Sequence, residues 1–221
     1  MAAREPLNRE KILDAAQTIA DELGLSGLSM RRLAKALGVE AMALYNHVAN
    51  KNAILDGLAD RVFAEVELPD PALPWPERVR ALATSTHAAL GRHPVVPLAL
   101  VTDQANPTTL AALRPIEALV GALAEAGFDD EDLRRAYSSV NALVYGTLTL
   151  TTLGFGREPA GSAGPEQLDV FVRKVDPAKL PHFARLLTVL PAPDLTADFA
   201  WTLDRLIAGL EAAAPAQEGA S

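Results

Sequence analysis

Cysteine is absent from the 221 residues of the sequence. Its absence excludes disulfide bonds, thiolate metal sites and cysteine nucleophiles, and it fits a reducing compartment, so a cytoplasmic protein is expected. Residues 1–10 contain no apolar core of the kind found in a secretory signal. Aromatic residues are scarce, at 5% of the chain, and the abundance of alanine and leucine favours packed helices over a β-sheet.

Long hydrophobic runs and enzyme motifs are also missing. The most apolar stretch, residues 136–155, is interrupted by seven serine, threonine and asparagine residues, whereas a membrane span needs about 20 mostly apolar residues. The chain has no glycine-rich phosphate loop, no nucleophile elbow and no paired-histidine zinc motif, and its four histidines lack metal-ligand spacing. We therefore expect neither a membrane protein nor an enzyme, and no metal or cofactor.

Proline is missing from residues 7–68, although the chain has 16 prolines and 15 of them lie at or beyond Pro69. Such a shift in composition marks two regions of different build. We expect a first domain over residues 1–68, a second domain over residues 69–214 and a disordered tail over residues 215–221. The proline-rich start of the second region predicts a stiff linker.

Positive charge is in the minority, with 20 Lys and Arg residues against 28 Asp and Glu residues and a net charge of −8. This balance argues at first against a nucleic-acid partner. The segment 29–51 nevertheless carries four basic residues and one acidic residue, a net of +3. Because screening confines such a field to about 8–10 Å at physiological salt, a local basic patch can bind phosphates even on an acidic protein.

Helix caps divide the first region into four predicted helices. Asn8 and Ser29 are good N-caps, and Gly24 and Gly38 suit helix C-termini. The predicted helices cover residues 9–23, 30–37, 41–48 and 51–67. The second and third are separated by a three-residue turn that contains Gly38, which is the signature of a helix-turn-helix unit.

The third predicted helix has an outward face that packing does not explain. With Leu44 and Val48 turned inward, Met42, Tyr45 and Asn46 point outward at about 100° per residue. An ordinary helical hairpin and a DNA-binding unit both fit this pattern. The exposed tyrosine, methionine and asparagine, with basic residues on either side, favour the DNA-binding unit.

Lys51 occupies the first turn of the fourth predicted helix, where a cation opposes the helix macrodipole. An anion bound at this helix N-terminus would remove the conflict, since the lysine and the free backbone N–H groups both attract phosphate. The position therefore predicts a phosphate contact.

The second region is helical throughout, so the predicted fold class is all-α. The predicted helices cover residues 77–90, 95–101, 106–126, 129–153, 176–190 and 195–213, with a mobile loop over 155–175. The helices over 129–153 and 195–213 have more apolar surface than one subunit readily hides, which predicts a two-fold, four-helix interface in a homodimer. The alternative is that these apolar residues pack within the subunit.

Four short motifs in the first region resemble the DNA-binding segment of the TetR family of repressors, in particular the branch around the tetracycline repressor. The motifs are LGVE at 37–40, LY-x-HV at 44–48, NK at 50–51 and LDxLA at 55–59. Weaker matches, such as Trp75 and Tyr145-Gly146, extend the resemblance across the second region. The resemblance implies an all-helical, two-domain homodimer that binds palindromic operator DNA and releases it when a small molecule enters the second domain.

The same resemblance assigns a set of residues to DNA contact. These residues are Ser29, Arg31, Ala41, Met42, Tyr45, Asn46, His47 and Lys51. An asparagine amide can bond two atoms of adenine, and Ala41 or Met42 can meet a thymine methyl group. Tyr45, His47 and Lys51 suit the DNA backbone. Because Ala41, Met42 and Asn46 differ from the tetracycline repressor's residues, a different operator is expected.

The cavity positions depart from the tetracycline repressor, so a magnesium-chelated tetracycline is not expected as the effector. Leu82, Leu100 and Leu150 stand where the tetracycline repressor has a drug-contacting amide and two metal-binding positions, and leucine cannot coordinate a hard cation. A more apolar or aromatic effector is expected. The polar candidates for the cavity are Thr86, His87, Gln104, Tyr137, Asn141 and Tyr145. Each of them could instead only satisfy buried backbone or neighbouring helices.

The sequence therefore predicts a ligand-responsive, DNA-binding transcriptional repressor that acts as a homodimer. A transcriptional activator of the same fold is an alternative that the sequence does not separate from a repressor. A small-molecule carrier or an enzyme that only resembles a regulator is an alternative from another class.

Overall fold

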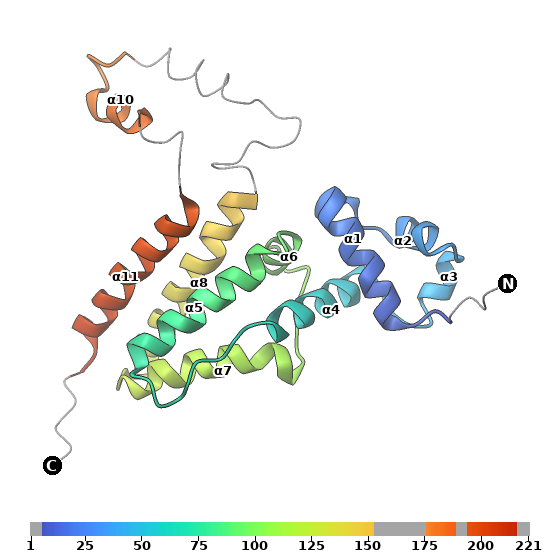
Figure 1. Cartoon of the computed structure of the whole chain (residues 1–221), viewed down its shortest axis with the longest axis horizontal. Coiled ribbons are helices and arrows are strands. Elements are labelled where there is room, and N and C mark those ends of the chain that lie inside the picture. The colour runs from blue at the N-terminus through green and yellow to red at the C-terminus, as the bar shows by residue number, and fades with distance from the viewer. Residues whose placement is uncertain (1–5, 153–175, 189–193, 216–221) are drawn as a thin grey trace.

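The computed structural model describes residues 6–152, 176–188 and 194–215, and all the regular structure in these ranges is helical. This confirms the all-α fold class. Figure 1 shows a small helical head at the N-terminal end and a larger body, with α4 (Lys51–Ala64) running from one to the other. The predicted loop 155–175 and the tail beyond residue 215 lie outside the described residues.

The head begins with α1 (Arg9–Gly27), which the Asn8 side chain caps by accepting a hydrogen bond from the Lys11 backbone N–H at 2.9 Å. Gly24 lies at the predicted stop and has a φ of +69°, a left-handed conformation that favours glycine. The helix resumes after this break instead of ending there. α2 (Met30–Leu37) begins after Ser29 and ends at Gly38, which is left-handed as expected.

α3 (Ala41–Leu44) is shorter than the predicted helix 41–48. Residues 45–47 form a turn, in which the His47 and Val48 N–H groups both donate to the Leu44 carbonyl. The reason lies just downstream. Asn50 must be extended, with φ −167° and ψ −176°, to accept the Ala53 N–H and cap α4, so the helical conformation has to end before it.

The body contains α5 (Trp75–Gly91), α6 (Val95–Val101), α7 (Leu110–Glu125), α8 (Asp130–Thr152), α10 (Pro181–Leu187) and α11 (Leu195–Ala213). Two boundaries differ from the prediction by four or more residues. α7 begins at Leu110 and not at 106, because Thr109 caps it by accepting the Ala112 N–H. α10 begins at Pro181 and not at 176.

A single hydrophobic cluster runs from the head through α4 into the body. Along α4 it includes Ile54, Leu55, Leu58, Val62 and Phe63, all at most 3% exposed. The helix is thus buried on several sides, against α1 in the head and against α5, α6 and α7 in the body. Within the described part of the chain, no helix is long and apolar enough to cross a membrane.

Candidate functional site

α3 and the turn that follows it present several exposed side chains on the surface of the head. Met42 is 74% exposed and Tyr45 47% exposed, while Leu44 is fully buried. Asn46 and His47 are also exposed. The predicted outward face of Met42, Tyr45 and Asn46 is therefore present, although Tyr45 and Asn46 lie in the turn and not on the helix.

Two basic side chains near this face bond to the end of α1. Lys51 Nζ donates to the Leu25 carbonyl at 2.9 Å, and Arg32 Nη1 donates to the Gly27 carbonyl at 2.6 Å. The macrodipole conflict at Lys51 is thus relieved within the chain, and its predicted phosphate contact stays a prediction. Arg31 is exposed on α2, whereas the Ser29 hydroxyl caps α2 by accepting the Arg32 N–H at 3.3 Å.

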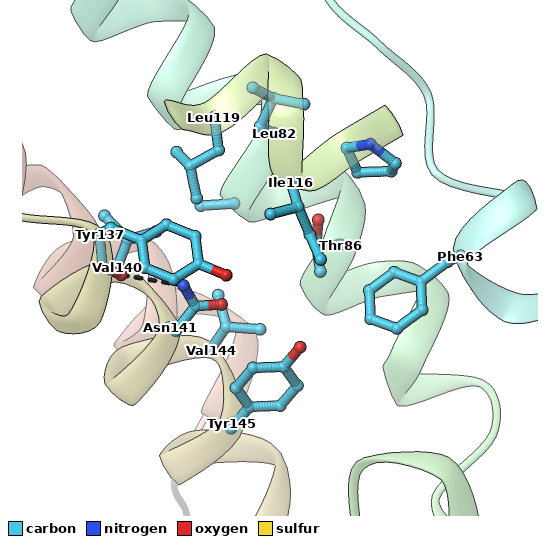
Figure 2. Close-up of a pocket in the computed structure, with 12 residues that line it drawn as sticks. Phe63, Leu82, Thr86, Ile116, Leu119, Tyr137, Val140, Asn141, Val144 and Tyr145 are labelled. Atoms are coloured by element: carbon cyan, nitrogen blue, oxygen red, sulfur yellow. Dashed lines mark hydrogen bonds between the residues drawn. The ribbon is translucent and has the colours of Figure 1, made fainter. Parts of the chain in front are cut away.

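A small cavity of about 20 Å³, room for about one water molecule, lies in the body between α4, α5, α7 and α8. Its lining, most of which Figure 2 labels, is formed by Phe63, Leu82, Ala83, Thr86, Pro115, Ile116, Leu119, Tyr137, Val140, Asn141, Val144 and Tyr145. None of these side chains is charged. The set contains no carboxylate and no imidazole, which are the ligands that protein-bound cations prefer.

The polar groups of the cavity come from α5 and α8. Asn141 Nδ2 donates to the Tyr137 carbonyl at 2.9 Å, which leaves the amide oxygen as an acceptor. Figure 2 shows the hydroxyl groups of Thr86, Tyr137 and Tyr145 among the apolar side chains of the lining. Burial, with a smaller contribution from Tyr137, raises the pKa of Tyr145 to about 12. The phenol is therefore neutral at physiological pH and can donate or accept a hydrogen bond.

Five of the predicted effector-site residues line the cavity, namely Leu82, Thr86, Tyr137, Asn141 and Tyr145. The other three do not. His87 follows Thr86 by one residue, about 100° around the helix, so it faces α11 and stacks on Phe199 with ring centroids 3.9 Å apart. Gln104 bonds to the Thr102 hydroxyl at 2.9 Å, and Leu100 lies near the end of α6 without reaching the lining.

Other cavity residues were not predicted as effector contacts. Phe63 comes from α4, where the sequence pattern marks it only as an apolar core position. Pro115 and Ile116 come from α7, and Pro115 was predicted only as a kink. Pro115 removes one hydrogen bond inside α7. This break in the helix was the only signal in the sequence that α7 borders a cavity at this point.

The stacked His87 makes the stability of the protein depend on pH. Burial lowers the pKa of His87 from its ordinary value of 6.5, whereas the unfolded chain keeps the ordinary value. As pH falls through 6.5, the unfolded state gains a proton that the folded state resists, so the free energy of unfolding decreases until the lower folded pKa is passed.

We expect His87→Phe, which keeps a stacked ring but cannot titrate, to lose part of this dependence. Urea unfolding from pH 7.5 to pH 5 would measure it, as the difference in the fall of the transition midpoint between the two proteins. An identical fall in both would show that His87 does not contribute.

A helix-turn-helix head with an exposed face, joined through a shared helix to a body that contains a small, largely apolar cavity, is the arrangement of a ligand-binding transcriptional regulator. The chain belongs to the TetR family. The family model of bacterial regulatory proteins of the tetR family matches residues 12–58, and the model of the tetracyclin repressor-like C-terminal domain matches residues 68–214.

Individual relatives agree with this assignment. An HTH-type transcriptional regulator of Saccharopolyspora erythraea is 33% identical over 213 residues, which span 94% of this chain and 86% of that protein. The class D tetracycline repressor protein of Escherichia coli is 42% identical over 90 residues, 39% of this chain and 41% of that protein. The structure of the Streptomyces coelicolor TetR family protein ActR in complex with actinorhodin matches with a TM-score of 0.78 and 28% identity, over 96% of this chain and 99% of that one.

Proposed function

We propose that the protein is a homodimeric repressor that binds a palindromic operator and is released from it by an uncharged, largely apolar effector. The observation that carries this proposal is that α4 contacts both the head and the cavity. The helix packs against α1 of the head, and its Phe63 forms part of the cavity wall. A molecule that enters the cavity therefore contacts α4, the helix against which α1 of the head packs.

Release would follow from a shift between two conformations. In a dimer of this geometry the two recognition elements enter successive major grooves, about 34–36 Å apart. An effector that binds better to a conformation with a different spacing favours that conformation. A dimer with the wrong spacing engages only one half-site well, and its affinity for the operator falls.

The expected dimer interface is formed by α8 and α11, which lie side by side at the end of the body away from the head (Figure 1). Trp201 is 61% exposed and Leu150 52% exposed, although both are large and apolar. Several other apolar residues of α8 and α11 are buried within the subunit, so they pack in its core and not at the expected interface. These buried residues are Val140, Val144, Leu148, Phe199 and Leu203.

The effector class follows from the lining of the cavity. An anion or cation would lose its hydration there without meeting an opposite charge, which is costly. Thr86, Tyr137, Asn141 and Tyr145 offer neutral hydrogen bonds within an otherwise apolar lining, the combination typical of small-molecule sites. An aromatic molecule with a few carbonyl or hydroxyl groups matches this chemistry, and it would have to widen the cavity of about 20 Å³ to enter. Actinorhodin, held by the related ActR, supports the same choice.

A gel-shift assay with DNA from around the protein's own gene tests the proposal. Retardation at low salt that a small molecule relieves would support it. Failure to retard any fragment would overturn it in favour of a carrier or enzyme without DNA activity. Transcription of the neighbouring genes in a deletion strain separates a repressor, whose loss raises transcription, from an activator.

Substitutions in the head should separate base recognition from backbone binding. Asn46→Ala is expected to change the preferred base at one position of each half-site, because a bidentate amide contact contributes about 1–3 kcal/mol of discrimination. Lys51→Ala is expected to weaken binding to all sequences about equally and to lower the salt dependence. Selection from random duplexes, followed by affinity measurements at several salt concentrations, would measure both effects.

Asn52→Ala is the matched control, since Asn52 is exposed on α4 next to Lys51. Urea unfolding should accompany the measurement, because Lys51→Ala also removes the bond to the Leu25 carbonyl. An unchanged preferred site in Asn46→Ala would show that Asn46 does not read a base.

A further inference from the structure

Two carboxylates on α4 accept hydrogen bonds from the segment that leads into α7. Asp56 Oδ1 accepts from the Asn106 backbone N–H at 2.6 Å. Asp60 Oδ1 accepts from the Thr109 hydroxyl at 2.8 Å and from the Thr109 N–H at 3.4 Å. Because residues four apart share one face of a helix, the two aspartates hold this segment along a single side of α4.

Thr109 serves both helices at once. Its hydroxyl oxygen accepts the Ala112 N–H at 3.3 Å and so caps α7. The hydroxyl proton is donated to Asp60. The hydroxyl group has only one proton to donate, and that proton is used in the bond to Asp60. If α4 moves away from the start of α7, either this bond breaks or the Thr109 side chain rotates with Asp60 and gives up the bond from the Ala112 N–H.

The two ends of this connection reach the two functional parts of the protein. α7 continues from Thr109 to Pro115 and Ile116, which line the cavity. On α4, the residue after Asp60 is Arg61, which pairs with Glu10 and Asp14 of α1 in the head. Adjacent residues of one helix therefore contact the N-terminal end of α7 on one side and the DNA-binding head on the other.

We propose that Asp60 and Thr109 are a positioning pair that makes the α7 wall of the cavity and the DNA-binding head move together, with Asp56 and Asn106 as a second point of attachment. This inference rests on the proposed function. Loss of the pair leaves the DNA-contacting surface and the cavity intact but weakens their coupling through α7. DNA binding is then transmitted less to α7, and by the reciprocity of linkage an effector bound against α7 weakens DNA binding less.

Hydrogen exchange measured by mass spectrometry on peptides covering residues 103–119 tests the pair without a known effector. The proteins are the wild type, Asp60→Ala, Thr109→Val and the control Thr108→Val, which changes the exposed neighbouring threonine. The probe is a DNA duplex that the wild-type protein selects from a random library. Thr109→Ser, which retains the hydroxyl group, should behave as the wild type.

In the wild type and in Thr108→Val, the bound duplex should slow exchange in these peptides by at least about fivefold, the lower end of typical coupling between sites. Asp60→Ala and Thr109→Val should still bind the duplex but lose most of this protection. Asp60→Ala is decisive, because it leaves the bond between the Thr109 hydroxyl and the Ala112 N–H in place. Wild-type protection in Asp60→Ala would overturn the proposal.

Failure of the proposed function would be distinguishable from failure of the pair. If no duplex is selected, the repressor assignment is wrong, and exchange in the free protein decides about the pair. Faster exchange at the start of α7 in Asp60→Ala than in Thr108→Val would support a connection from α4 to α7. Equal exchange in the two variants would overturn it.

Discussion

Gly57→Ala is expected to lower the free energy of unfolding by about 1–3 kcal/mol through overpacking, and to weaken operator binding. Gly57 lies on α4 in close contact with α1. A Cβ atom there would be 2.9 Å from Leu13 Cδ2 and 2.7 Å from Arg9 Nη2. The arginine tip can move aside, but Leu13 is fully buried, so making room requires its side chain to repack or α1 to shift away from α4, and a shift of α1 would reorient the head. Urea unfolding and a gel shift measure the two effects.

Gly121→Ala on α7 provides the matched control. No atom lies within 4 Å of the Cβ position at Gly121, so the better helix propensity of alanine should raise stability by about 0.5–1 kcal/mol. The two substitutions are chemically identical and have opposite expected signs. A gain in stability at Gly57 as well would show that α1 and α4 have room to spare.

Phe63→Ala is expected to cost about 3–5 kcal/mol, the usual penalty for removing a buried aromatic side chain. Phe63 is 3% exposed, and its ring is the part of α4 that contacts the cavity. Truncation therefore also enlarges the cavity. Empty apolar cavities bind benzene, so benzene should raise the urea midpoint of this variant more than that of the wild type.

Leu110→Ala serves as the comparison for Phe63→Ala. Leu110 is 78% exposed, and surface substitutions of this kind usually change stability by no more than about 0.5 kcal/mol. Benzene should have no extra effect on it. If benzene stabilises Phe63→Ala no more than the wild type, the space left by the ring does not join the cavity.

The head was largely predictable from sequence because its signals are local. Asn8, Ser29 and Asn50 cap helices through their own side chains, and Gly38 adopts the left-handed conformation expected of it. The outward position of Met42 follows from helical periodicity alone. Two predicted helix ends in the head were wrong: α1 resumes after Gly24 and continues to Gly27, and α3 stops at Leu44, ahead of the extended Asn50 that caps the next helix.

The cavity was predicted less completely because it depends on how distant helices meet. Tyr137, Asn141 and Tyr145 recur at helical spacing on α8, so they could be grouped in advance. Thr86 and His87 are adjacent, and sequence alone does not say which of them turns toward α8 and which toward α11. The part played by Phe63 depends on the packing of α4 against α5 and α7, which no local pattern contains.

The bond from Lys51 to the Leu25 carbonyl bears on the entropy of DNA binding. A free lysine side chain loses up to about 2 kcal/mol of rotamer entropy when it is immobilised. In this protein the chain of Lys51 is already held by one of its three ammonium protons, and the other two can still meet a phosphate. Much of the entropic cost of the predicted phosphate contact would therefore be met during folding of the head, before DNA binds.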